Sequence, residues 1–148
     1  MRCLFMCILV SQSLCFGAEH LCVRDILVPQ YPLLARLAKV QGSVSLELEV
    51  ENDGKIVSAK GSGPDRLLVE EAENNVRQWS FAPSTAKESA RRHHTIIYVY
   101  RLEGQPVDYN PVPTVWLHLP DRVEIVTRPL TPQVDKSKPP GAIRGGPR

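Results

Sequence analysis

The sequence lacks an excess of charge of either sign. Its 148 residues hold 18 Lys and Arg against 16 Asp and Glu, which gives a formal net charge of +2. Proteins that bind nucleic acid or anionic membranes carry a much larger basic excess on one face. The pair Arg91-Arg92 is too small a patch to bind nucleic acid through release of counterions. The composition therefore predicts no nucleic-acid partner and gives no support for recruitment to an anionic membrane.

The sequence also lacks the motifs that carry catalysis or hold metals. It contains no glycine-rich phosphate loop, no cysteine pair at zinc-binding spacing and no nucleophile elbow. His93 and His94 are adjacent, and neighbouring residues of a strand point to opposite faces, so the two imidazoles cannot easily bind one ion. We therefore predict that the protein is not an enzyme, uses no cofactor or metal and has no small-molecule substrate.

A long hydrophobic run is missing as well. Residues 1–18 begin with Arg2 and an apolar stretch and end in Gly17 and Ala18, the layout of a secretory signal peptide. Polar residues interrupt the stretch, which falls short of the roughly 18 apolar residues that a membrane-spanning helix needs. We predict a cleaved signal peptide over residues 1–18. An uncleaved anchor and an ordinary N-terminal strand are the alternatives.

Cysteines are few, and most of them lie in the predicted signal peptide. Cleavage after residue 17 or 18 leaves only Cys22. One thiol cannot form an internal disulfide, so Cys22 is predicted to be a free thiol in a short lead-in over residues 19–28. An intermolecular disulfide in an oxidising compartment is the alternative.

Proline is absent from the start of the chain and concentrated at its end. None lies in residues 1–28, and nine of the 13 lie in residues 105–148. Within that end, two apolar stretches flank Pro120-Asp121, which predicts an accessory β-hairpin within residues 105–128. Residues 129–148 are rich in proline and glycine and are predicted to form a disordered basic tail.

The middle of the chain begins with a helix and a β-hairpin. A short helix follows Pro32 and ends before Gly42, because proline suits a first turn and glycine a stop. Ser43–Glu51 alternates apolar and polar residues, the pattern of a strand with one buried face. Asn52-Asp53-Gly54 then forms a turn, and Lys55–Gly61 returns as a second strand.

A second helix and a third strand complete this region. The helix starts near Pro64 and ends at Trp79. The aromatic pair Trp79 and Phe81 is predicted to pack in the core. Thr95–Leu102 is rich in β-branched and aromatic residues, which predicts a strand. The apolar stripe of the helix recurs at intervals of four, four and three residues: Leu68, Ala72, Val76 and Trp79.

A specific set of motifs lies at the ends of these elements. Pro29-Gln30-Tyr31-Pro32 precedes the first helix, the first strand runs to Asp53-Gly54, and Trp79-Ser80-Phe81-Ala82-Pro83 follows the second helix. In this order the chain strongly resembles the C-terminal domain of TonB-family energy transducers. The resemblance covers residues 29–104.

The resemblance implies an α+β fold: a three-stranded antiparallel sheet with two helices on one face. It also implies a periplasmic protein that captures a short extended segment of an outer-membrane TonB-dependent receptor during transmembrane transport. In the family that segment pairs with the exposed edge of the third strand, and adding a strand to an open edge gives affinity through the main chain. The positions matching the family's partner-binding residues are Gln30, Tyr31, Pro32, Thr95, Ile97, Val99 and Arg101.

Three hypotheses follow from these features. The first is a transducer that serves receptor-mediated transport, which predicts an uncleaved inner-membrane anchor. The second is a stand-alone module, periplasmic or secreted, that uses the same fold for another envelope partner or forms a homodimer through edge strands. The third is that the accessory hairpin pairs with the third strand and fills the edge, so that no site for strand addition remains.

Overall fold

The computed structural model describes residues 21–84 and 91–132. The predictions for residues 1–18 and for most of the basic tail therefore fall outside the described residues. The elements are β1 (Val23–Asp25), α1 (Leu33–Leu37), β2 (Gly42–Val50), β3 (Ile56–Ser62), α2 (Arg66–Val76), β4 (Ser80–Phe81), β5 (Arg92–Leu102), β6 (Thr114–His118) and β7 (Arg122–Thr127).

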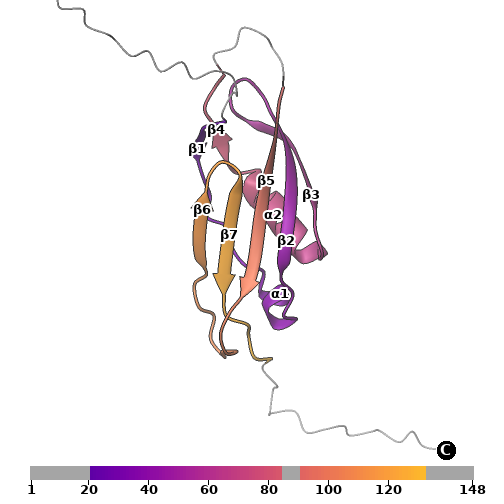
Figure 1. The fold of residues 1–148 in the computed structure, drawn as a ribbon, viewed down its shortest axis with the longest axis vertical. Helices are drawn as coiled ribbons and strands as arrows, with labels where there is room; N and C mark the ends of the chain where they lie inside the picture. Colours follow the sequence, from indigo (N-terminus) through magenta and orange to yellow (C-terminus); the bar gives the residue numbers. More distant parts are fainter. Residues whose placement is uncertain (1–20, 85–90, 133–148) are drawn as a thin grey trace, which may run out of the picture.

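The α+β class is confirmed, but the prediction of a three-stranded antiparallel sheet is wrong. The main sheet has five strands in the order β3-β2-β5-β7-β6, with β5 and β7 parallel and the other neighbours antiparallel. The predicted hairpin, β6 and β7, exists, and it joins the sheet beside the third predicted strand, β5. Among the described residues, α2 lies behind one face of this sheet, and the face toward the viewer in Figure 1 is open.

Helix α2 packs on the covered face through the predicted stripe. Leu68, Ala72 and Val76 are fully buried, and Trp79 is 3% exposed. The helix begins at its cap, Asp65, whose carboxylate accepts a bond of 2.8 Å from the amide of Leu67. It ends at Val76, earlier than predicted, so Trp79 reaches the core from the turn that follows. Core packing of Trp79 and Phe81 is confirmed.

A buried amide ties three parts of the chain together behind the sheet. Asn75 of α2 donates to the carbonyl oxygen of Leu27 at 3.0 Å. Its Oδ1 accepts from Trp79 Nε1 at 3.1 Å and from the hydroxyl of Tyr98 in β5 at 2.9 Å. Because buried polar groups are costly when unpaired, this network fixes the lead-in and α2 against β5.

The lead-in is more ordered than the sequence predicts. Strand β1 pairs with β4 in a second sheet of two strands. Gly54 lies against β4, and its carbonyl accepts from the amide of Phe81 at 2.8 Å. A Cβ at Gly54 would lie 1.8 Å from the carbonyl oxygen of Phe81, and its φ is +90°, so only glycine fits this turn. Cys22 is an exposed free thiol.

The segment after β5 is fastened to α1 as well as to the sheet. Arg36 of α1 is 1% exposed, and its side chain donates to Asn110 Oδ1 and, at 3.1 Å, to the carbonyl of Arg128. Leu130 is 6% exposed, so the predicted disordered tail starts later than residue 129. Within the described ranges, no helix has the length and apolar content needed to cross a membrane.

Candidate protein-interaction surface

The edge of β5 that the sequence proposes for a partner is occupied by β7. Ile97 lies opposite Arg122, and the register continues in parallel to Leu102 opposite Thr127. The amide of Ile97 donates to the carbonyl of Asp121 and that of Glu103 to the carbonyl of Thr127, both at 2.8 Å. The hypothesis that the accessory hairpin pairs with the third predicted strand is therefore correct for this edge.

The predicted partner-binding residues fall into two groups on opposite sides of the sheet. The side chains at alternate positions of β5 lie on its open face, where Ile97 is 42% exposed. Tyr31 lies on the covered face: its ring packs edge-on against Tyr100 with centroids 5.2 Å apart, and its hydroxyl donates to the carbonyl of Val40 at 2.6 Å. The structure does not bring the groups together, and their binding of a partner stays a prediction. The group on the open face is Thr95, Ile97, Val99 and Arg101.

The opening motif around Tyr31 holds α1 and α2 in place. Gln30 is exposed, and its backbone amide donates a hydrogen bond to the carboxylate of Glu71 in α2. Burial raises the pKa of Glu71, and the bond from Gln30 opposes that rise. Burial also raises the pKa of Tyr31 to about 12, with a smaller opposing effect from Arg36. Pro32 is half-buried before the first turn of α1. These contacts give Gln30, Tyr31 and Pro32 a structural role.

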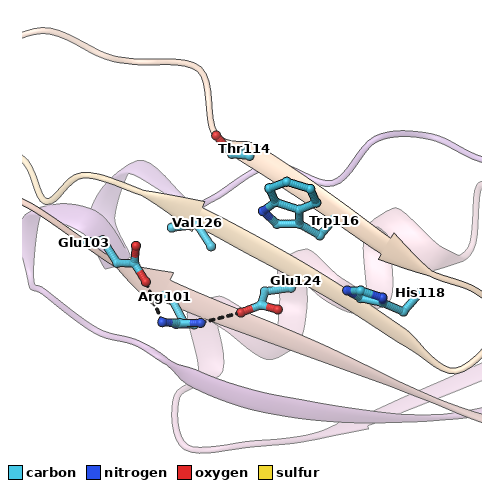
Figure 2. Close-up of a pocket in the computed structure, with 7 residues that line it drawn as sticks. All are labelled: Arg101, Glu103, Thr114, Trp116, His118, Glu124 and Val126. Carbon is cyan, nitrogen blue, oxygen red and sulfur yellow. Dashed lines mark hydrogen bonds and ion pairs between the residues drawn. The ribbon is translucent and has the colours of Figure 1, made fainter.

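A groove of about 450 Å³ lies on the open face across β5, β7 and β6 (Figure 2). The register places Val99 opposite Glu124 and Glu124 opposite Trp116, so the three strands present their side chains in rows. Trp116 is 57% exposed at the rim. The groove is lined by Arg101, Glu103, Thr114, Trp116, His118, Glu124 and Val126.

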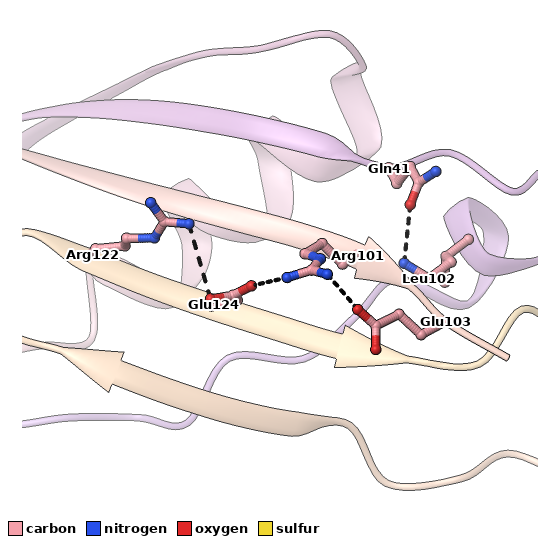
Figure 3. A network of polar contacts seen from close by, with 6 residues as sticks. All are labelled: Gln41, Arg101, Leu102, Glu103, Arg122 and Glu124. Atoms are coloured by element: carbon pink, nitrogen blue, oxygen red, sulfur yellow. Dashed lines mark hydrogen bonds and ion pairs between the residues drawn. The ribbon is translucent and has the colours of Figure 1, made fainter.

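Charges in this groove are paired with one another (Figure 3). Arg101 bonds Glu124 at 2.7 Å and Glu103 at 2.5 Å, and Arg122 lies 3.9 Å from Glu124. The hydrogen bond from Arg101 holds the pKa of Glu124 below its usual value. Ion pairs of this kind contribute little stability, because water screens the charges and the long side chains lose freedom when they pair. Their effect here is to leave a groove with balanced charge and an exposed indole.

The two edges of the five-stranded sheet differ in how they are protected. At the β3 edge, side chains of α2 already bind the backbone: Arg77 donates to the carbonyl of Ala59 at 3.1 Å, and the amide of Gly61 donates to Glu73 at 2.7 Å. Strand β3 also carries Lys60, and lysine discourages pairing at an edge.

The β6 edge carries none of these protections within its own strand. Its five residues, Thr114–His118, include no Lys, Arg, Asp, Glu or Pro. Four of the five are exposed, among them Trp116 and Leu117. Natural proteins usually blunt such an edge, so β6 is the edge best suited to pair with another chain. The sequence predicted the hairpin, with its place beside the third strand as one of three hypotheses. The signal for this surface was the alternation of Thr114, Trp116 and His118 with apolar residues.

His93 and His94 point to opposite faces of β5. The ring of His94 packs against Phe81 on the covered face, and its Nε2 lies 3.1 Å from the carbonyl oxygen of Pro120. His93 is exposed. No group of three or more potential metal ligands occurs among residues 21–84 and 91–132.

Comparison with known proteins gives one match. The family described as Gram-negative bacterial TonB protein C-terminal matches residues 28–102, which are 75 residues and just over half of the 148. No curated protein and no solved structure matches the chain. The matched family is a non-enzymatic domain of transport and protein interaction, and it implies a place in the cell envelope. The match ends at the last residue of β5, so the family relation rests on the region before the hairpin. The chain therefore belongs to the family of Gram-negative TonB protein C-terminal domains.

Proposed function

We propose that this chain is a protein-interaction domain of the cell envelope that binds an extended segment of a protein partner at the outer edge of β6. The observation that supports this most strongly is the sheet order, in which β7 covers β5 and β6 lies at the end. A partner strand at β6 would continue the sheet and gain main-chain hydrogen bonds without a preformed pocket.

Displacing β7 to reopen the edge of β5 would be costly. Val123 and Ile125 of β7 are both 0% exposed. Exposing a fully buried aliphatic side chain costs about 1.5–3 kcal/mol, so the two together cost about 3–6 kcal/mol. A segment that had to expel β7 would therefore bind more weakly than one that pairs with an open edge, by a factor of about 10² to 10⁴. This difference favours β6 over β5 as the binding edge.

The groove beside β6 would supply selectivity. A strand added at β6 places alternate side chains on the open face, next to Trp116 and His118. An exposed indole at a rim is suited to an apolar or aromatic side chain of the partner. Backbone pairing then sets affinity, and the contacts with Trp116 favour a segment with an apolar residue at the facing position.

The first candidate for the partner is an outer-membrane TonB-dependent receptor, which would link the protein to transmembrane transport. Another envelope protein is the second candidate, and the domain then acts as a stand-alone module. For the stand-alone module we propose a periplasmic or secreted protein released by cleavage after residue 18. The alternative, energy transduction to a receptor, requires an uncleaved inner-membrane anchor. Strand addition at β6 is part of the proposal in both cases.

Site-specific photo-crosslinking in a Gram-negative envelope tests the binding edge. A photoreactive residue replaces Leu117 on β6, and a matched one replaces Val57 on β3; the two native side chains are 42% and 45% exposed. We expect a crosslink to a second protein from position 117 and none from position 57. A third photoreactive residue replaces Ile97 on β5. A crosslink from position 57 alone, or from position 97 alone, would contradict binding at β6.

A further inference from the structure

Strand β6 offers a partner a short and sharply bounded edge. Pro113 precedes it and Pro120 follows it by two residues. Proline has no amide hydrogen and cannot extend a hydrogen-bonded ladder, so pairing is confined to about five residues centred on Trp116. This edge lies beyond residues 28–102, outside the region that matches the family.

We propose that β6 pairs antiparallel with β6 of a second copy of this chain, around a two-fold axis at Trp116. The inference rests on the proposed function, because it names a partner for the same edge. A two-fold contact uses one patch on both copies, so each residue i that faces residue j is matched by j facing i. Trp116 then faces its own counterpart, and Thr114 faces His118 of the second copy.

The chemistry of the strand suits pairing with itself. Like charges placed opposite each other destabilise a strand pair, and Thr114–His118 holds no permanently charged side chain. On the open face the two Trp116 rings meet, and aromatic pairs are favourable cross-strand contacts. On the other face Val115 lies opposite Leu117. The contact would cover Trp116 and Leu117, which are 57% and 42% exposed in the single chain.

The proposed contact is small, which sets its expected strength. Stable interfaces bury about 1,200–2,000 Å², and one pair of five-residue strands covers less than that. We therefore expect a weak dimer, with a dissociation constant of roughly one micromolar or higher. Such a dimer is weak enough to exchange with another extended segment at the same edge.

Single-cysteine crosslinking of the full chain tests the register. In a background with the four native cysteines changed to serine, new cysteines are introduced one at a time at Thr114, Trp116 and His118, with Val57→Cys on β3 as the control. Directly opposite residues have Cβ atoms about 4.5–5.5 Å apart, close enough for oxidation to a disulfide. Thr114 and its counterpart lie about 13 Å apart in the proposed register, since a strand rises about 3.3 Å per residue.

We expect Trp116→Cys to form covalent dimers alone, Thr114→Cys and His118→Cys to form them only when mixed, and Val57→Cys to stay monomeric. The mixture retains Trp116, so the test does not depend on a variant that lacks it. Covalent dimers from Thr114→Cys alone would show another register and overturn the two-fold axis at Trp116. Dimers from Val57→Cys alone would move the contact to β3.

Sedimentation of the unmodified full chain gives a second measurement. We expect its mass to rise from one copy toward two as concentration increases, and Leu117→Lys to weaken that association at least tenfold. A single copy at every concentration would overturn the inference. Purified protein contains no other partner, so that result would leave binding of a different protein at β6 to be decided by photo-crosslinking. If photo-crosslinking from position 117 gives only crosslinks between two copies of this chain, the proposed envelope partner is rejected and the dimer is supported.

Discussion

Replacing Ile125 by alanine tests whether the hairpin belongs to the core. Ile125 lies in β7, opposite Tyr100 of β5, and is 0% exposed. The change removes three carbons, and at about 0.8 kcal/mol each their lost burial costs about 2.4 kcal/mol. A remaining cavity of about 50 Å³ adds about 1.2 kcal/mol at roughly 24 cal/mol per Å³. We expect Ile125→Ala to lower the free energy of unfolding by about 3–4 kcal/mol.

A loss of this size is readily measured. Domains of this kind are stable by about 5–15 kcal/mol, so the variant should lose a large part of its stability. Urea denaturation followed by circular dichroism reports the change as a lower midpoint with an unchanged slope. The whole domain should unfold in one transition, because β7 shares its core with β2 and β5.

Val126→Ala is the matched control, because Val126 is the next residue of β7 and lies on the open face at the groove. It is only partly buried, and its loss should cost less than about 1 kcal/mol. If Ile125→Ala costs no more than Val126→Ala, or if the hairpin melts separately at low urea, then β7 does not share the core and the edge of β5 is accessible.

Asn75→Ala should lower the free energy of unfolding by about 2–3 kcal/mol, because it leaves the buried hydroxyl of Tyr98 without its acceptor and removes one of the two acceptors of Trp79 Nε1. Asn74→Ala, at an exposed neighbour, should change it by less than about 0.5 kcal/mol in the same urea titration. Tyr31→Phe removes the hydroxyl bond of 2.6 Å and should cost about 1 kcal/mol while leaving photo-crosslinking from position 117 unchanged; loss of the crosslink in a folded variant would return Tyr31 to the binding site. Burial raises the pKa of Tyr31 to about 12 and those of Tyr98 and Tyr100 still further. Their contribution to stability is present below pH 10, the ordinary pKa of tyrosine, and is lost as pH rises above it, because the unfolded chain loses these protons first. Urea midpoints at pH 9, 10 and 11 should therefore fall increasingly steeply, and a constant midpoint would contradict the burial of these three rings.

Local patterns were sufficient to predict the elements in the middle of the chain. Strict alternation in β2 predicts its buried face, and Val44, Leu46, Leu48 and Val50 are all buried. The helical stripe of α2 and the turn at Gly54 follow from side-chain spacing and backbone conformation in the same way. Such signals lie within a few residues of each other, so a sequence displays them directly.

Pairing between distant strands could not be predicted in the same way. The apolar residues of β7 indicate a strand with one buried face, but no local pattern says that this face lies beside β5 rather than apart from it. The strands β1 and β4 have three and two residues, too few for a period to appear. The candidate site therefore moved from β5 to β6, since sheet order decides which strand is left at the edge.

The seven residues matched to the family's binding positions show the same limit. The motifs around them were sufficient to identify the family. Whether these residues lie at an open edge depends on the hairpin, which lies beyond residues 28–102. Tyr31 is identifiable as part of the opening motif, but its contact with Tyr100 on the covered face is visible only in three dimensions.

Amide hydrogen exchange along β5 tests the central claim most directly. In the structure the amides of Ile97, Val99 and Arg101 face β7, as the bond of 2.8 Å from Ile97 to Asp121 shows, while those of Tyr98 and Tyr100 face β2. If β7 fills this edge, we expect both sets to exchange at similarly slow rates in the monomeric chain, measured by nuclear magnetic resonance. Fast exchange at Ile97, Val99 and Arg101 beside slow exchange at Tyr98 and Tyr100 would show an open edge on β5 and contradict the account.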